Sequence, residues 1–193
     1  MAGMPVWRID RLAHRAVPLV IALDAEDDAL VYVSLGARLH GVVEHARRYG
    51  ARMEVESRKR TAASTQLREY LCGERRDFDL RTRPMGTTFQ RKAWNALRDI
   101  PFGQTRSYAV QAKTIGLDGG ARAVGRANGA NPIPIVLPCH RVLGASGSMT
   151  GFGGGIDTKR WLLALEREGH VPEWTPAERS ARRESVSQLG LFA

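Results

Sequence analysis

The apolar pattern of this chain changes near residue 84, and this change limits the possible folds more than any other feature. Runs of β-branched and apolar residues separated by helical segments precede it, whereas helical spacing predominates after it. Residues 81–86 join the two parts and contain Pro84 and Gly86, which is typical of a linker. The 193 residues are therefore expected to adopt an α/β fold, with a small N-terminal domain and a mainly helical C-terminal domain.

Residues 1–82 predict the α/β domain. Its strands are expected in three β-branched or apolar runs and in one alternating segment, at 6–9, 19–23, 30–35 and 77–80. Its helices are expected over 39–49 and 62–71, with Gly73 in position to end the second. Cys72, at the end of that helix, is interpreted as a packing residue, and no catalytic pattern occurs in the domain.

Residues 83–169 predict the helical domain. Thr87 and Gln90 have the spacing of a capping box, which begins a helix that ends before Pro101. Further helices are expected over 107–115, 121–128 and 158–168. The first two of these are short and flank a glycine-containing turn, a pattern compatible with a helix-turn-helix.

The segment Pro138-Cys139-His140-Arg141-Val142 contains a candidate nucleophile and follows an apolar run at 133–137. Cysteine attacks as the thiolate, and a neighbouring His or Arg can lower the thiol pKa from about 8.5 to roughly 3.5–7.5. A buried core cysteine explains the same five residues equally well. The two cysteines, Cys72 and Cys139, form no CxxC pair, which indicates free thiols in a reducing compartment, and we expect a cytoplasmic protein.

The net charge of +9 is concentrated in the middle of the chain. Residues 83–166 carry 11 Lys and Arg against four Asp and Glu, whereas residues 1–82 carry 14 against 12 and residues 167–193 carry four against four. A basic surface around a candidate nucleophile indicates a polyanionic partner, with nucleic acid the first candidate. The longest apolar run near the N-terminus, at 17–23, is too short to span a bilayer, so no membrane partner is expected.

Seven stretches within residues 87–168 resemble the O6-alkylguanine-DNA alkyltransferases, also called methylated-DNA protein-cysteine methyltransferases. In order, they are Phe89-Gln90-Arg91-Lys92-Ala93-Trp94, Ile100-Pro101-Phe102-Gly103, Ser107-Tyr108, Ala121-Arg122-Ala123-Val124-Gly125, Asn131-Pro132, Pro138-Cys139-His140-Arg141-Val142 and Gly151-Phe152-Gly153-Gly154-Gly155. The N-terminal third resembles the family only in its pattern of elements, consistent with a ribonuclease H-like domain. The resemblance implies a DNA repair protein that acts as a monomer on double-stranded DNA and needs no cofactor.

In such a protein Cys139 takes the alkyl group from O6 of guanine by one displacement and keeps it, so that each molecule acts once. The resemblance implies a relay in which His140 reaches the thiol through water and Glu166 orients His140. Tyr108 would face the flipped base and polarise the departing guanine, and Asn131 would fix the turn beneath an active-site strand. Taken alone, Glu166 would be an exposed helix charge and Tyr108 a core residue.

The target atom is inaccessible in stacked DNA, so the base must be flipped out of the duplex. The resemblance assigns Arg122 to the gap that the base leaves, and it places the helix 121–128 in the minor groove. The small residues Ala121, Gly125 and Ala127 would allow close approach to DNA, although such spacing also occurs in tight helix packing. Arg126 would contact a phosphate, or would be a solvated charge.

Three residues match positions that form the base pocket of the family. Val142 and Gly153 would contact the base through backbone groups, and Phe152 would form a wall. Phe152 replaces the commoner tyrosine. Gln111 stands where the family usually has an apolar residue, which leaves the packing or the register of the helix 107–115 open.

After Gly169 the composition changes to Pro, Glu, Arg and Ser, which predicts a solvated C-terminal tail at 170–193. The tail carries Gln188, Leu189, Leu191 and Phe192, which resemble the peptide that binds the bacterial replication sliding clamp. A C-terminus folded back onto the domain is the alternative.

Two other functions stay open at this point. A lesion-recognition protein would share the binding helix but lack the reactive cysteine, and a thiol hydrolase or redox sensor would need a remote His or a resolving cysteine. The histidines are scattered along the chain, and no metal site is indicated.

Overall fold

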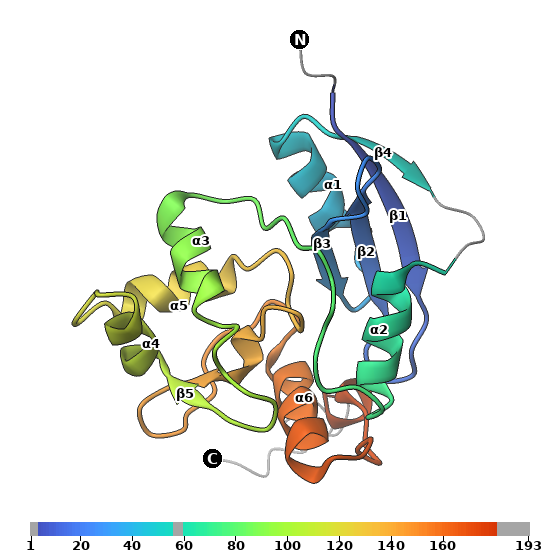
Figure 1. Ribbon diagram of the computed structural model, residues 1–193. Helices are drawn as coiled ribbons and strands as arrows, with labels where there is room; N and C mark the ends of the chain where they lie inside the picture. The colour runs from blue at the N-terminus through green and yellow to red at the C-terminus, as the bar shows by residue number, and fades with distance from the viewer. Residues whose placement is uncertain (1–3, 56–59, 181–193) are drawn as a thin grey trace, which may run out of the picture.

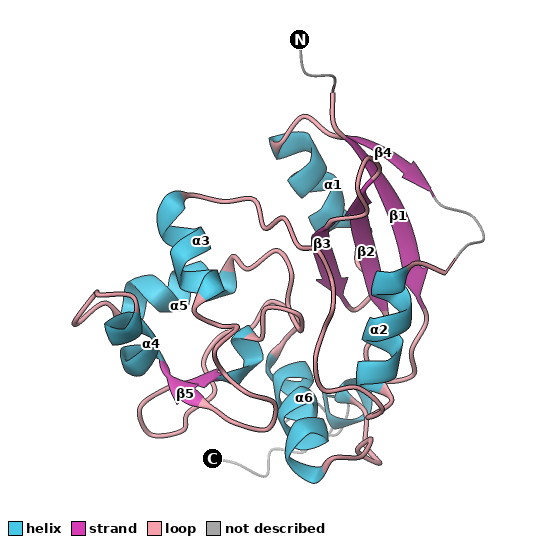
Figure 2. Cartoon of the chain, in the orientation of Figure 1, coloured by secondary structure: helices cyan, strands magenta, loops and turns pink. Residues whose placement is uncertain are grey.

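The computed structural model describes residues 4–55 and 60–180, with a sheet region beside a mainly helical region (Figures 1 and 2). The sheet contains β1 (Val6–Leu12), β2 (Leu19–Asp24), β3 (Leu30–Leu35) and β4 (Arg52–Val55), in the order β3-β2-β1-β4. Strands β1, β2 and β3 pair antiparallel, and β4 pairs parallel to β1. The predicted α/β fold, with a sheet region followed by a mainly helical region, is confirmed.

Strand β2 is buried along its whole length because helices cover both faces of the sheet (Figure 1). Leu19, Ile21 and Leu23 face one side, where α2 (Ala62–Leu71) packs. Val20 and Ala22 face the other side, where α1 (Leu39–Arg48) packs. A strand buried on both faces needs no polar alternation, which explains its continuous apolar run.

The core cluster on the α2 side of the sheet continues into the helical region without a break. It joins Leu67 of α2 to Trp94, Ile133 and Trp161 of the C-terminal part. The edge strand β3 is also tied to that part, because the Val33 amide donates to the Pro132 carbonyl at 2.8 Å. The sheet therefore supports the segment that leads to Cys139.

The helical region follows the predicted order. Its elements are α3 (Thr88–Asn95), β5 (Arg106–Ser107), α4 (Tyr108–Thr114), α5 (Ala121–Gly129), the 3-10 helix η1 (Cys139–Arg141), β6 (Val142–Leu143) and α6 (Ile156–Glu168). The predicted capping box is confirmed, since the Thr87 side chain accepts from the Gln90 amide and the Gln90 side chain accepts from the Thr87 amide. Helices α4 and α5 contact each other across the turn at 115–120, as expected for a helix-turn-helix.

The packing and the register of α4, which the sequence left open, follow from the burial of Gln111. Ser107 caps the helix by accepting from the Val110 amide, which leaves Val110 half exposed and buries Gln111. The Gln111 side chain exchanges hydrogen bonds with Asn128 of α5, at 2.7 and 3.3 Å, and donates to the Ala93 carbonyl at 2.9 Å. A buried amide is tolerated here because its donors and its acceptor are used.

Two expectations about the N-terminal region are wrong, and one strand of the sheet was not expected. Residues 77–80 form no strand, because the Gln66 side chain bonds both backbone groups of Asp79, at 2.9 and 3.0 Å, and only Thr82 bridges Leu30 of the sheet. Strand β4 was not expected, because its four exposed residues carry no apolar run, and it forms by pairing with the edge of β1. Cys72 is exposed rather than packed.

The longest described helix is α6, with 13 residues. It begins after Gly155, whose φ is 87°, and ends at Gly169, whose φ is 71°. Glycine adopts this left-handed conformation without the steric cost of a side chain. Among residues 4–55 and 60–180 no helix has the length and apolarity needed to cross a membrane.

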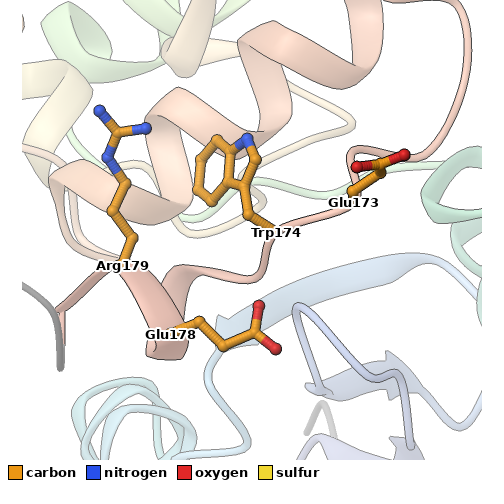
Figure 3. Close-up of a pocket in the computed structure, with 4 residues that line it drawn as sticks. All are labelled: Glu173, Trp174, Glu178 and Arg179. Atoms are coloured by element: carbon orange, nitrogen blue, oxygen red, sulfur yellow. The ribbon is translucent and has the colours of Figure 1, made fainter.

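The expected solvated tail is wrong for part of the segment, because Pro172, Thr175 and Pro176 are buried and Trp174 is half-buried, whereas residues 177–180 are exposed as expected. Trp174 lies against the main core cluster, and the Arg179 guanidinium lies 5.0 Å from its ring centroid. Arg15 donates to the Glu173 carbonyl at 3.0 Å. Figure 3 shows the side chains around a cavity of 570 Å³ in this segment, Glu173, Trp174, Glu178 and Arg179. Residues 188–192, which carry the clamp hypothesis, lie outside the described residues.

His45 of α1 lies in an aromatic cluster on the outer face of the sheet. Its ring centroid is 5.5, 4.7 and 4.9 Å from those of Trp7, Tyr32 and Tyr49. Burial, aided by the charge of Arg48, lowers the pKa of His45 from 6.5 to about 4. The folded protein therefore holds this imidazole neutral where the unfolded chain would protonate it.

We predict that the free energy of unfolding falls as the pH drops from about 6.5 to about 4, because the unfolded state binds the proton first. Urea denaturation across this interval measures the effect. His45→Phe keeps an aromatic ring but cannot be protonated, so it should lose less stability than the wild type over the same interval. Equal losses in the two proteins would contradict this origin.

Candidate active site

Cys139 begins the 3-10 helix η1 and follows a buried turn, not the strand that was expected. Ile135 in this turn has a φ of 76°, which is a strained conformation for a β-branched residue. The turn persists because residues 132–140 are all buried. The thiol is therefore held on backbone whose shape the surrounding core determines.

Asn131 connects the turn to the thiol. Its side-chain oxygen accepts from the Ile133 amide at 3.0 Å, and its nitrogen donates to the Leu137 carbonyl at 2.7 Å. The same nitrogen lies 3.2 Å from Cys139 Sγ and donates to it. One side chain thus holds both ends of the turn and contacts the sulfur.

The thiol is not activated in the resting protein. Burial raises the pKa of Cys139, although the hydrogen bond from Asn131 and the charge of Lys159 oppose this effect. Adjacent His140 and Arg141 do not lower the pKa of the thiol as their sequence position suggested, because both side chains bind Glu166 instead. Reaction therefore requires a base that removes the thiol proton.

Glu166 of α6 is the centre of a buried cluster, which we call the Glu166 cluster and define as Glu166, His140 and Arg141. His140 Nε2 lies 2.8 Å from Glu166 Oε1. Arg141 donates to both carboxylate oxygens, at 2.9 to 3.1 Å, and to the Ile100 carbonyl at 2.5 Å. The Gly103 amide donates to Glu166 Oε2 at 3.0 Å.

The charge of Glu166 determines the tautomer of His140. Burial alone would raise the pKa of Glu166, but the hydrogen bonds and charges of His140 and Arg141 outweigh it and lower the pKa to about 2. An ionised carboxylate can only accept, so His140 Nε2 carries the hydrogen. Burial lowers the pKa of His140, so the ring is neutral and its Nδ1 is unprotonated.

His140 Nδ1 is buried and has no hydrogen-bond partner among the described protein atoms. Within the described residues, no direct hydrogen bond joins the side chains of His140 and Cys139. An unprotonated imidazole nitrogen on the residue that follows a protonated thiol in the sequence is a candidate general base. A bridging water would connect them, as the sequence suggested.

Two contributors to this site were not expected. Tyr70 of α2 donates to Glu166 Oε1 at 2.5 Å, and no local sequence pattern distinguishes it from a core tyrosine. Lys159 of α6 is fully buried and donates to the Val142 carbonyl at 2.6 Å. Its spacing of seven residues from Glu166 places both on one face of the helix, which was an available signal.

Cys139 lines a cavity of 280 Å³ between the sheet region and the helical region. Phe152 and Gly153, which were predicted for the base pocket, line this cavity from the helical region, and so does Asn131. The opposite wall comes from β3 and the start of α1 and was not expected, with Tyr32, Ser34, Arg38 and His40. Val142, the third residue predicted for the pocket, does not line this cavity; it is fully buried, and its carbonyl accepts from Lys159.

A second cavity, of 540 Å³, lies along α5. Most of the residues that were assigned to DNA line it, namely Ala121, Arg122, Gly125 and Arg126. Tyr108 and the loop that contains Gly144 and Thr150 also line it. Arg122 and Arg126 are both exposed. A groove with small residues on its floor and arginines beside it fits a nucleic-acid backbone.

Ala127 does not belong to that surface, contrary to expectation. Its side chain is buried in the cluster that joins α3, α4 and α5. Its carbonyl accepts from Trp94 Nε1 at 2.7 Å, which ties α5 to α3. Residues 121 and 125 face the groove, whereas residue 127 lies about half a turn further round the helix.

No group of metal-ligating side chains occurs in the ranges 4–55 and 60–180.

Comparison with known proteins finds a matching family model and relatives that carry the same activity in their names. The family model for "6-O-methylguanine DNA methyltransferase, DNA binding domain" matches residues 88–168. A methylated-DNA–protein-cysteine methyltransferase of Mycolicibacterium paratuberculosis is 57% identical over 110 residues, which are 57% of this chain and 66% of the relative. A protein of the same name from Methanosarcina acetivorans is 53% identical over 104 residues, which are 54% of this chain and 67% of that protein.

Solved structures extend the similarity to the sheet region. The crystal structure of Mycobacterium tuberculosis OGT in complex with DNA has a TM-score of 0.71 and 39% identity, and the match covers 86% of this chain and 95% of that one. The O6-methylguanine-DNA methyltransferase of Pyrococcus kodakaraensis, at 22% identity and a TM-score of 0.65, has the same fold. The chain belongs to the 6-O-methylguanine DNA methyltransferase family.

Proposed function

We propose that this protein repairs DNA by transferring the alkyl group of O6-alkylguanine to Cys139. A bond forms between Sγ and the alkyl carbon, the bond from that carbon to O6 breaks, and its electron pair stays on the guanine. The thiol loses one proton and the guanine gains one, so the products are S-alkylcysteine and unmodified guanine. A thioether is not readily hydrolysed, and each molecule therefore acts once.

The observation that carries this proposal is that His140, the residue next to the buried Cys139 in the sequence, has a buried Nδ1 without a hydrogen-bond partner among the described residues. His140 accepts the thiol proton through water and becomes an imidazolium, and the Glu166 carboxylate stabilises that charge at 2.8 Å. A soft thiolate then displaces guanine from the alkyl carbon. Tyr108, which lines the groove along α5, polarises the departing base.

The groove along α5 is the proposed DNA-binding surface. A relative at 39% identity has been crystallised in complex with DNA. The net positive charge of residues 83–166 favours a polyanion, and the exposed Arg122 projects from α5, where it would fill the gap left by a flipped base. Arg126, one turn later, would contact a phosphate.

The first prediction concerns the modified atom. Incubation with duplex DNA containing O6-methylguanine should add one methyl group to the protein, located on Cys139 by peptide mass spectrometry. Cys139→Ser should bind the same DNA without a mass change. Tight binding of wild-type protein without transfer would favour a lesion-recognition protein instead.

The second prediction concerns base flipping. Arg122→Ala should slow repair of duplex DNA by on the order of tenfold or more, because unstacking a base costs a few kcal/mol that the arginine offsets. Reaction with free O6-benzylguanine should change little, because no base has to be flipped. Equal losses on both substrates in single-turnover assays would contradict this role.

The third prediction concerns phosphate contact. Arg126→Ala should reduce the slope of log K against log salt by about 0.9, the value for one phosphate contact. Arg47→Ala on α1 is a matched control, because it removes an exposed arginine from the sheet region. Equal slopes for Arg126→Ala and the wild type would remove Arg126 from the interface.

We further propose that residues 188–192 tether the protein to the bacterial sliding clamp and that it works as a cytoplasmic monomer. Short peptides with a few apolar anchors suit weak tethering. Deletion of residues 188–193 should abolish clamp pull-down and leave alkyl transfer to free oligonucleotides intact. Unchanged clamp binding would refute the tether.

The state of Cys72 and Cys139, both free thiols, agrees with a reducing compartment.

A further inference from the structure

Tyr70 connects the sheet region to the Glu166 cluster. Among the described residues before Pro84 it alone hydrogen-bonds to that cluster. It lies on α2, on the buried face of the helix, and is 0% exposed. Its ring packs against Phe78 and Phe102, with centroids 5.4 and 6.1 Å away.

The Tyr70 hydroxyl is a permanent hydrogen-bond donor. Burial, followed by the charge and hydrogen bond of Glu166, raises the pKa of Tyr70 well above its usual value, so the phenol stays protonated. It donates to Glu166 Oε1 at 2.5 Å and lies 3.3 Å from His140 Nε2. The shorter contact dominates, because hydrogen bonds weaken as the distance between donor and acceptor increases.

We propose that Tyr70 is a positioning residue that limits how strongly Glu166 attracts a proton to His140, and so keeps His140 available as a base. This inference rests on the proposed alkyl transfer. Glu166 Oε1 accepts from Tyr70, His140 and Arg141 together, and each donor takes a share of the carboxylate charge. Without the hydrogen bond from Tyr70, the Glu166 carboxylate would favour the imidazolium form of His140 more strongly in the resting state. An imidazolium cannot accept the thiol proton.

The charged groups around His140 raise or lower the pKa of its imidazole. Arg141 and Lys159 are cationic and disfavour the imidazolium, whereas Glu166 favours it. Cys139 is uncharged in the resting state, because burial raises its pKa. Tyr70 is the neutral group in this set whose removal changes the charge available to His140 without removing an ion.

The test is Tyr70→Phe in the full-length protein, which removes the hydroxyl and keeps the ring. The pKa of the His140 imidazole, measured by 15N NMR, should rise by about one unit, because a hydrogen bond to a charged group contributes roughly that amount. The acid limb of the rate of reaction with O6-benzylguanine should move to higher pH by a similar amount. An unchanged or lowered His140 pKa would overturn the inference.

Two further variants separate this role from packing. Phe78→Leu disturbs the packing of the Tyr70 ring but leaves the hydroxyl, so it should lower the melting temperature without moving the His140 titration. Placing 3-fluorotyrosine at position 70 makes the phenol a stronger donor and should move the titration in the opposite direction. An equal shift in Phe78→Leu and Tyr70→Phe would reduce Tyr70 to a structural residue.

Tyr49→Phe is a matched control, since it removes a hydroxyl from the aromatic cluster on the outer face of the sheet. It should leave both readouts unchanged. If the wild-type protein were not alkylated, the proposed function would fail, while the NMR titration would still decide the role of Tyr70. If the wild type were alkylated and Tyr70→Phe moved neither readout, only the inference about Tyr70 would fail.

Discussion

The arrangement of the site depends on the hydrogen bonds that the buried carboxylate of Glu166 accepts. This carboxylate accepts hydrogen bonds from His140, Arg141, Tyr70 and the Gly103 amide. These donors come from α2, from the loop after α3 and from η1, whereas the glutamate itself lies on α6. A buried charge is tolerated only when it is paired and hydrogen-bonded, so the carboxylate draws these segments together.

The thiol and its base are both kept in their neutral forms. Burial disfavours the thiolate at Cys139 and the imidazolium at His140, and the two groups are not joined by a direct hydrogen bond in the described structure. Such a site holds the thiol protonated in the absence of substrate, which suits a residue that the proposed reaction would consume. Asn131 and Lys159 are held by hydrogen bonds to Cys139 and to the Val142 carbonyl in the absence of substrate.

The sheet region contributes side chains to the candidate active site as well as to the core. It supplies Tyr70 to the Glu166 cluster and one wall of the cavity at Cys139. The sequence predicted most strands and helices of this region, because β-branched runs and helical spacing act over a few residues. It did not predict the exposed strand β4, and it placed a strand at 77–80 where the Gln66 side chain takes the backbone hydrogen bonds instead.

The sequence by itself determined the order of the six α-helices, the capping box at Thr87, the basic middle segment and the residues of the motif around Cys139. The tertiary structure decided whether each of these residues is buried and what it bonds. It turned Ala127 into a packing residue, satisfied Gln111 with Asn128, and raised rather than lowered the pKa of the thiol. Local signals act within a turn or a strand, whereas the contact between Tyr70 and Glu166 joins residues 96 positions apart and exists only once the core has packed.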